Sequence, residues 1–167
     1  QSRNAVFVDV TSSPAIAEKT ANILKKGISV VSASKLANAM NQDYYDSIRE
    51  NSKATGALFK YETNVGAGLP IIETLQTLLN TGDTIEKIEG IISGTLSYLF
   101  SQFDGSIPFS ELVKNARESG YTEPDPRDDL NGVDVGRKIL ILARETGAKL
   151  ELEDVSIQSL IPENMDP

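Results

Sequence analysis

The first sixty residues alternate between short β-branched runs and longer helix-like segments, and this alternation most constrains the fold. The β-branched runs are AVFVDV (5–10), ISVVSAS (28–34) and ALFKYET (57–63). The segments between them, 11–27 and 35–56, are each followed or closed by a glycine, a residue typical of helix ends. Strands separated by single helices pair in parallel, so we predict an α/β fold. No G-x-G-x-x-G turn follows a strand, which makes this the later part of a Rossmann-type parallel sheet.

The pattern changes near residues 63–66, where we place a domain boundary. Residues 1–64 are predicted to be the C-terminal part of a dinucleotide-binding domain, and residues 65–167 a second, α+β domain. In that domain we predict helices over 70–83, 93–103, 108–120 and 132–147, and strands over 84–92 and 154–162. The second domain ends soon after a strand, so we expect the chain to be a piece of a longer protein, truncated at both ends.

Composition narrows the partners of the chain. Its net charge of -8 disfavours nucleic acid, because an acidic chain repels a phosphate backbone. The chain has no long apolar run and no signal-peptide pattern, so we expect no membrane partner. Cysteine is absent, for which a cytoplasmic location is the simplest interpretation.

Histidine is absent as well, and this absence restricts the chemistry of the chain. Acid–base catalysis must then use Lys, Asp, Glu, Tyr or water. The sequence therefore excludes Ser-His-Asp catalysis and histidine-ligated metals within the chain.

The segment GYTEPDPRDDLNGVDVGRK (120–138) concentrates acidic residues ahead of a lysine. Its acids are Glu123, Asp125, Asp128, Asp129 and Asp134. Two prolines hold the backbone extended. One interpretation is a solvated acidic loop in which Asn131 caps the next helix. The alternative is a site for a cationic ligand such as an ammonium group, which would offset the repulsion among these carboxylates.

Asp134 and Lys138 are four residues apart and share a helix face. A surface ion pair of this kind contributes about 0.2–0.5 kcal/mol. The helical wheel favours a covered pair instead, because Lys138 borders a broad apolar arc while Ile141 falls among polar positions. That arc comprises Val133, Val135, Gly136, Ile139, Leu140, Leu142 and Ala143.

Three shorter segments also contain candidate ligand-binding residues. ETNVGAGL (62–69) is read first as a connector, with a cation site using Glu62 and backbone carbonyls, or a phosphate nest, as alternatives. Gly94 and Thr95 stand at a predicted helix start, where amides bind a carboxylate or the residues simply cap the helix. Hydroxyls and a lysine follow the first two strands, on the side where α/β sheets bind ligands or where they serve as caps and surface residues. These are Thr11, Ser12, Ser13 and Lys35.

Taken together, three segments resemble the homoserine dehydrogenase family. They are TNVGAGLPIIETLQTLLNTGD (63–83), IEGIISGTLSYLF (88–100) and GYTEPDPRDDLNGVDVGRK (120–138). Their order is most similar to the dehydrogenase portion of bifunctional aspartokinase/homoserine dehydrogenases. The resemblance implies NAD(P)H-dependent reduction of L-aspartate 4-semialdehyde to L-homoserine, on the route to threonine and methionine. It also implies that residues 65–167 bind the substrate and form a homodimer, and that an aspartokinase domain is fused to the full-length protein.

The resemblance further implies roles for individual residues. Lys138 matches the proton donor, and Lys35 matches a lysine near the nicotinamide that acts in catalysis or cofactor binding. The substrate-binding residues implied are Glu123, Asp129, Asp134, Gly94, Thr95 and Tyr121. The cofactor contacts implied are Thr11, Ser12, Lys35 and Gly120. A structural sodium ion is implied at the Glu62 carboxylate and at the carbonyl groups of Val65, Ala67 and Leu69.

Two departures from the family affect these expectations. Ala33-Ser34-Lys35 stands where the family often has Pro-Asn-Lys. The glycine-rich first turn of the dinucleotide-binding domain is also missing, so we expect the chain alone to have little or no dehydrogenase activity. The alternatives are a non-catalytic oligomerisation or regulatory module with the same fold, or a different nicotinamide oxidoreductase.

Overall fold

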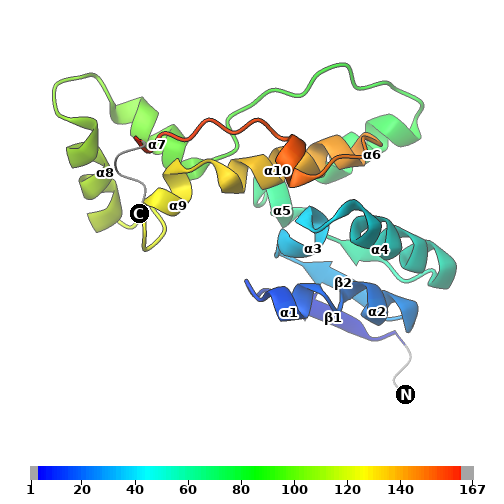
Figure 1. The fold of residues 1–167 in the computed structure, drawn as a ribbon. Coiled ribbons are helices and arrows are strands. Elements are labelled where there is room, and N and C mark those ends of the chain that lie inside the picture. The colour runs from blue at the N-terminus through cyan, green and yellow to red at the C-terminus, as the bar shows by residue number, and fades with distance from the viewer. Residues whose placement is uncertain (1–3, 163–167) are drawn as a thin grey trace. The chain divides into compact units, whose positions relative to one another are not determined.

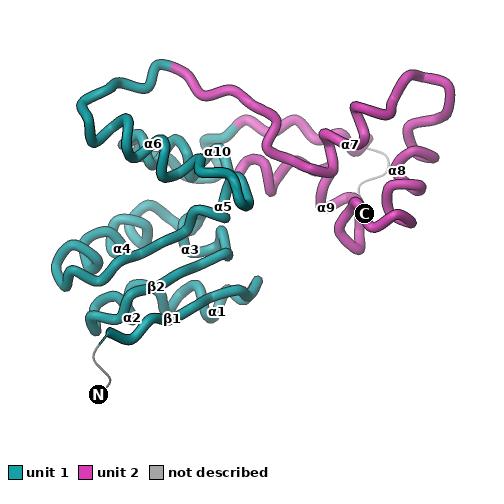
Figure 2. Tube along the Cα trace, turned by 180° about the vertical axis from the view of Figure 1, so that it is seen from behind, with its two compact units in different colours: residues 1–86, 137–155 teal, residues 87–136, 156–167 magenta. Residues whose placement is uncertain are grey.

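The structure, a computed structural model, describes residues 4–162 (Figure 1). The chain forms two compact units (Figure 2). Unit 1 contains residues 1–86 and 137–155, and unit 2 contains residues 87–136 and 156–167. The predicted division into domains 1–64 and 65–167 stays a prediction, because a functional domain need not coincide with a unit of spatial contact.

A three-stranded parallel sheet forms the base of unit 1. Its strands are β1 (Val6–Asp9), β2 (Ser29–Ser32) and β3 (Phe59–Lys60), in the order β1-β2-β3. Val8 pairs with Val31 in one ladder and Val30 with Phe59 in the other. The predicted α/β arrangement with a parallel sheet is confirmed.

Four helices pack on one face of this sheet. They are α1 (Pro14–Ala17), α2 (Thr20–Lys25), α3 (Leu36–Ala39) and α4 (Gln42–Thr55). Their buried core contains Leu24, Val30 and Ile48. The predicted helical segment 11–27 forms two helices, α1 and α2, and the segment 35–56 forms α3 and α4. The break between α3 and α4 has a local cause. Asn41 accepts a hydrogen bond from the backbone N–H of Tyr44 at 2.9 Å and so starts α4 anew.

Unit 1 is completed by α5 (Thr63–Gly66), α6 (Ile71–Asn80), the part of α10 (Val133–Glu145) from Arg137 onward, and the short 3-10 helix η1 (Leu152–Asp154). In both views α6 and α10 lie side by side (Figures 1 and 2). Ile141, predicted to lie among polar positions, is fully buried, whereas Ile139 of the predicted apolar arc is 36% exposed. The helical wheel was wrong here because it assumes one covered face, whereas α10 is covered on more than one side.

Unit 2 contains α7 (Gly94–Gln102), α8 (Phe109–Glu118) and α9 (Arg127–Leu130). Leu99, Leu112 and Ala116 form its core. Ser93 caps α7 by accepting a hydrogen bond from Leu96 N at 3.2 Å, at the start of the helix predicted over 93–103. Pro108 occupies the N-cap position of α8, at the start of the helix predicted over 108–120.

The strands predicted over 84–92 and 154–162 are wrong. In the described part of the chain, both segments lack strand pairing, and Leu152–Asp154 forms η1. An alternating pattern makes a strand only where a neighbouring strand accepts its hydrogen bonds. The backbone of 154–162 instead makes local bonds at η1 and one bond to a distant residue, from Leu160 N to Leu130 O at 3.0 Å. The predicted α+β character of residues 65–167 therefore stays a prediction.

Within residues 4–162, no helix combines the length and the hydropathy that a membrane-spanning helix requires.

Candidate active site

The predicted site residues are divided between the two units. Unit 1 contains Thr11, Ser12, Lys35, Glu62, Val65, Ala67, Leu69 and Lys138. Unit 2 contains Gly94, Thr95, Gly120, Tyr121, Glu123, Asp129 and Asp134.

The carboxyl ends of β1 and β2 form a compact turn region in unit 1. Asp9 is buried, and its Oδ1 atom accepts hydrogen bonds from the backbone N–H and the hydroxyl of Thr11, at 2.9 and 2.8 Å. Ala33 N donates to the carbonyl of Asp9 at 2.9 Å and ties the two strand ends together. Thr11 and Ser12 are exposed just beyond this edge, which is where parallel sheets bind ligands.

Lys35 occupies the N-cap position of α3 and is half-buried. The preceding residue, Ser34, donates its backbone N–H to the hydroxyl of Ser32 at 3.1 Å and accepts from Leu36 N at 3.4 Å. The Ala33-Ser34-Lys35 departure from the family pattern thus forms a serine-based turn. This turn holds Lys35 beyond β2, at the same edge as Thr11.

The glycine-rich segment after β3 acts as a connector in the structure. The two carboxylate oxygens of Glu62 accept hydrogen bonds from Ile72 N at 2.7 Å and Glu73 N at 2.9 Å. A carboxylate at this position stabilises the start of α6. Ala67 adopts a φ of 51°, which is uncommon for a residue other than glycine. Glu62 therefore has a structural role that needs no cation.

Asp129 is the centre of the candidate site in unit 2. Its Oδ1 atom lies 2.8 Å from the hydroxyl of Thr95, and its Oδ2 atom accepts from Glu123 N at 2.8 Å. The Thr95 hydroxyl also lies 2.9 Å from the carbonyl of Tyr121, whose ring stacks on Tyr98 at 4.4 Å between centroids. The structure thus brings Thr95, Tyr121, Glu123 and Asp129 together, and the carboxylate of Asp129 is used to hold them.

The other acids of the segment differ in their surroundings. Asp125 forms an ion pair with Arg127, with 2.6 Å between Oδ2 and Nη2. Hydrogen bonds from Arg127 lower the pKa of Asp125 to about 2. Glu123 and Asp128 are exposed. The ion pair accounts for Asp125 and the hydrogen bonds account for Asp129, which leaves Glu123 and Asp128 as exposed carboxylates. Of these two, Glu123 is the one whose backbone N–H contacts Asp129.

Two glycines set the ends of helices beside the site. Gly120 has a φ of 76° and ends α8, where Tyr121 N donates to Ala116 O at 2.9 Å. Gly132 has the same φ, and a Cβ atom there would lie 2.9 Å from the side chain of Ile157. Asn131 accepts a hydrogen bond from Val133 N at 2.9 Å and is the C-cap residue of α9, so its predicted role as the cap of α10 stays a prediction.

Asp134 and Lys138 lie four residues apart in α10 and are both half-buried. Neither a fully solvated nor a fully covered pair describes them. Sequence reasoning missed the charged residues at the other end of this helix, Arg144 and Glu145. Two adjacent opposite charges closing an apolar helix were the available signal.

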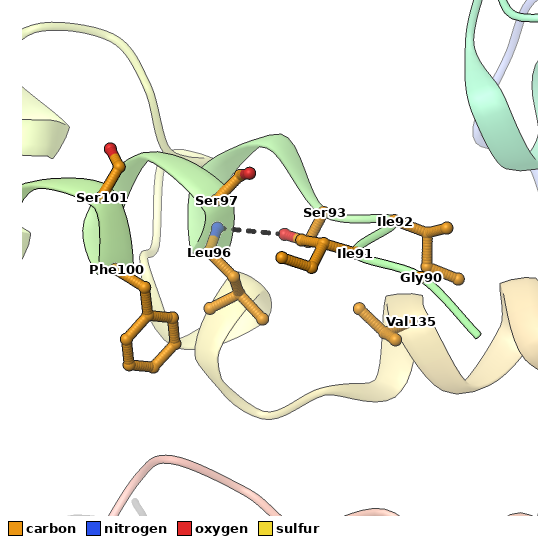
Figure 3. A pocket seen from close by; sticks show the side chains of 9 residues that line it. All are labelled: Gly90, Ile91, Ile92, Ser93, Leu96, Ser97, Phe100, Ser101 and Val135. Atoms are coloured by element: carbon orange, nitrogen blue, oxygen red, sulfur yellow. Dashed lines mark hydrogen bonds between the residues drawn. The ribbon is translucent and has the colours of Figure 1, made fainter.

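A cavity of about 520 Å³ lies in unit 2 beside α7 (Figure 3). It is lined by Gly90, Ile91, Ile92, Ser93, Leu96, Ser97, Phe100, Ser101 and Val135. Neither Glu123 nor Asp129 lines it. This apolar cavity therefore offers no carboxylate to an ammonium group, and it was not predicted from the sequence.

Two family models match consecutive parts of the chain. The model described as "Homoserine dehydrogenase, NAD binding domain" matches residues 1–62. The model described as "Homoserine dehydrogenase" matches residues 70–165.

Curated relatives are similar along nearly the whole chain. Bifunctional aspartokinase/homoserine dehydrogenase 2, chloroplastic, of Arabidopsis thaliana is 54% identical over 160 residues, which are 96% of this chain and 18% of the relative. Bifunctional aspartokinase/homoserine dehydrogenase of Haemophilus influenzae is 52% identical over 95% of this chain and 20% of the relative. The chain thus spans about a fifth of the length of these relatives.

Solved structures are similar too. A Candida auris protein described as of unknown function is 42% identical, with a TM-score of 0.92 over 97% of this chain and 47% of that protein. A hyperthermophilic archaeal homoserine dehydrogenase in complex with NADPH is 27% identical, with a TM-score of 0.77 over 90% of this chain and 48% of that protein. On the strength of the two family models, the chain belongs to the homoserine dehydrogenase family.

Proposed function

We propose that this chain carries the substrate-binding residues of an NAD(P)-dependent homoserine dehydrogenase, which reduces L-aspartate 4-semialdehyde to L-homoserine. The observation that carries the proposal is the Asp129 cluster, which is formed by Thr95, Tyr121, Glu123 and Asp129. Its hydrogen bonds order the segment that contains Glu123, whose side chain is exposed. The substrate bears an ammonium group, for which carboxylates are the matching partners. Residues 65–167 serve as the substrate-binding and dimerisation domain.

The residue roles follow from the chemistry of the reduction. Glu123 and Asp134 bind the ammonium group, while Gly94, Thr95 and Tyr121 line the pocket. When bound, the nicotinamide cofactor supplies a hydride. Negative charge then develops on the aldehyde oxygen, which Lys138 stabilises and protonates. Asp134, one helical turn earlier, orients Lys138.

The cofactor, NAD or NADP, is held at the sheet edge in this proposal. Thr11, Ser12 and Lys35 follow the carboxyl ends of β1 and β2, which suits a dinucleotide. Gly120 is proposed as a further cofactor contact. Hydroxyls and a lysine fit a ligand that carries phosphate groups. Lys35 is also proposed to support catalysis.

The proposal also includes a structural sodium ion. A carboxylate and the carbonyl oxygens of Val65, Ala67 and Leu69 are suitable ligands for a hard cation. Both oxygens of Glu62 already accept backbone hydrogen bonds, so the ion would share them. Thermal unfolding in NaCl and in tetramethylammonium chloride tests this assignment, and equal midpoints in the two salts would count against it.

The assembly of the full-length protein is proposed by analogy. The relatives are named as bifunctional aspartokinases, which supports a fused kinase domain. A homodimer formed through residues 65–167 and a cytoplasmic location stay predictions, and the Arabidopsis relative is chloroplastic by name. We also expect the 167-residue chain alone to show little or no turnover.

The first test is calorimetric titration of L-homoserine into this chain and into an Asp134→Ala variant. We expect binding by the unsubstituted chain and a loss of at least tenfold in affinity for the variant, because a charged hydrogen bond is removed. Asp128→Ala is the matched control, since Asp128 is an exposed acid of the same segment. Equal affinity in all three chains would contradict the assigned site and favour a non-catalytic module.

A further inference from the structure

A buried carboxylate in unit 1 joins the end of α10 to three other elements. The side chain of Glu145 is 6% exposed. Its Oε1 atom accepts from Tyr45 at 3.0 Å, from Tyr61 at 2.7 Å and from Arg49 at 2.9 Å. Its Oε2 atom accepts from Gln76 at 2.8 Å. These donors belong to α4, to the chain just after β3, and to α6.

The donors of this cluster keep their protonation state. Burial raises the pKa of Tyr45 and that of Tyr61, so both phenols remain donors throughout the range in which proteins are studied. The guanidinium of Arg49 lies 3.5 Å from the ring centroid of Tyr45 and balances the charge of Glu145. The carboxylate is therefore fully satisfied, which a buried charge requires.

Arg144 provides a second attachment next to the first. Its side chain is fully buried. It donates to the carbonyl groups of Asn38 at 2.9 Å and Met40 at 2.6 Å, and to that of Leu150 at 2.6 Å. Asn38 and Met40 lie at the end of α3, the short helix that begins directly after Lys35. Arg144 thus connects α10 to the helix that follows Lys35.

The position of Glu145 along α10 relates it to Lys138. The two residues are seven apart, so they lie on one helix face, about 10 Å from each other along the axis. The intervening Leu140, Ile141 and Leu142 are buried. Apolar contacts of this kind are non-directional and define the rotation of a helix poorly. Hydrogen bonds to one carboxylate from three directions define it well.

We propose that Glu145 and Arg144 are positioning residues for the reaction: Glu145 fixes the rotation of α10, and Arg144 fixes its end against α3. Together they set the direction in which the Lys138 side chain points and the position of Lys138 relative to α3, the helix that follows Lys35. The inference rests on the proposed function, in which Lys138 donates a proton.

The test uses Glu145→Gln in the complete enzyme. The amide keeps an oxygen for the tyrosines but loses the charge that faces Arg49, so α10 shifts while its apolar contacts remain. We expect kcat to fall about tenfold, since small misplacements of a catalytic group reduce the rate strongly. The affinity for NADPH, measured by fluorescence titration, should stay unchanged. Turnover is measured well below the unfolding midpoint of each variant.

Matched variants separate positioning from mere stability. Glu50→Gln, on the exposed side of α4, should leave kcat unchanged. Tyr61→Phe removes one donor without a charge, and we expect a smaller fall in kcat in the same direction. This variant also tests the inference if Glu145→Gln fails to fold.

A double-substitution cycle with Lys138→Ala decides between the outcomes. If Glu145 acts through Lys138, then Glu145→Gln has no further effect on the residual turnover of the Lys138→Ala enzyme, measured at high enzyme concentration. A further tenfold loss in that background, an unchanged kcat, or a parallel loss of NADPH affinity would overturn the inference. Full turnover by Lys138→Ala alone would instead contradict the proposed function.

Discussion

Unit 1 and unit 2 each contain a carboxylate that accepts hydrogen bonds through both oxygens, Glu145 in unit 1 and Asp129 in unit 2. The two differ in how far away in the sequence their donors lie. The donors to Glu145 are 69 to 100 residues away in sequence. Those to Asp129 are 34 and 6 residues away. Glu145 is buried and balanced by Arg49, whereas Asp129 is half-buried. One carboxylate fixes a helix within a folded unit, and the other shapes a local segment from which Glu123 is exposed.

The largest effect is expected when a long-range contact of unit 1, the guanidinium of Arg144, is removed. Arg144→Ala leaves the carbonyl groups of Asn38, Met40 and Leu150, which are buried or partly buried, without this donor. We expect the free energy of unfolding to fall by about 3–5 kcal/mol, the range for breaking a buried charged network. Urea denaturation measures the change, with exposed Arg117→Ala as the control. A loss below about 1 kcal/mol would show that unit 1 does not depend on this guanidinium.

Asp129→Asn tests the local carboxylate with a smaller expected effect. The amide oxygen can accept from only one of the two donors, the Thr95 hydroxyl or Glu123 N. The other donor then faces the NH₂ group. Because one hydrogen bond is lost, we expect a decrease of about 1 kcal/mol in the free energy of unfolding. Homoserine affinity should also fall, because the segment that carries Glu123 loosens. If the affinity is retained while stability drops, the Asp129 cluster does not order the binding segment.

The smallest effect is expected at the exposed ion pair of unit 2. The pKa of Asp125 is lowered to about 2 by Arg127, so the folded state binds this proton less readily than the unfolded chain does. The pair therefore contributes to stability at neutral pH, and its contribution is lost as the pH falls from about 4 to about 2. An NMR titration of the Asp125 carboxyl checks the value. In Arg127→Ala the pKa should return towards 3.8, and no change would remove Arg127 as its cause.

Much of the local structure could be predicted from the sequence. The β-branched runs contain β1, β2 and β3, and Ser93 caps α7 at the start of the helix predicted over 93–103. These features depend on residues within a few positions of one another. The turn at Ala33-Ser34-Lys35 is also local, because it is held by the hydroxyl of Ser34 and the hydroxyl of Ser32.

The candidate site could be predicted only in part. The resemblance to homoserine dehydrogenases implied Thr95, Tyr121 and Asp129 as site residues, and the structure brings these three together. Their contacts could not be deduced, because the hydroxyl of Thr95 meets a carboxylate 34 residues away. The role of Asp129 as an internal acceptor, rather than a free ligand, follows from the same contact.

The sequence by itself determined where α6, α7, α8 and α10 begin, because capping side chains, prolines and apolar periodicity act over a few residues. Only the tertiary structure decided which faces are covered and which extended segments become strands. Ile141 is buried against the wheel pattern, and residues 84–92 alternate without forming a strand in the described chain. Burial and strand pairing both require partners distant in sequence, as do the four hydrogen bonds of Glu145. The physical reason is that a side chain sets its own preference, while its neighbours in space decide whether that preference is satisfied.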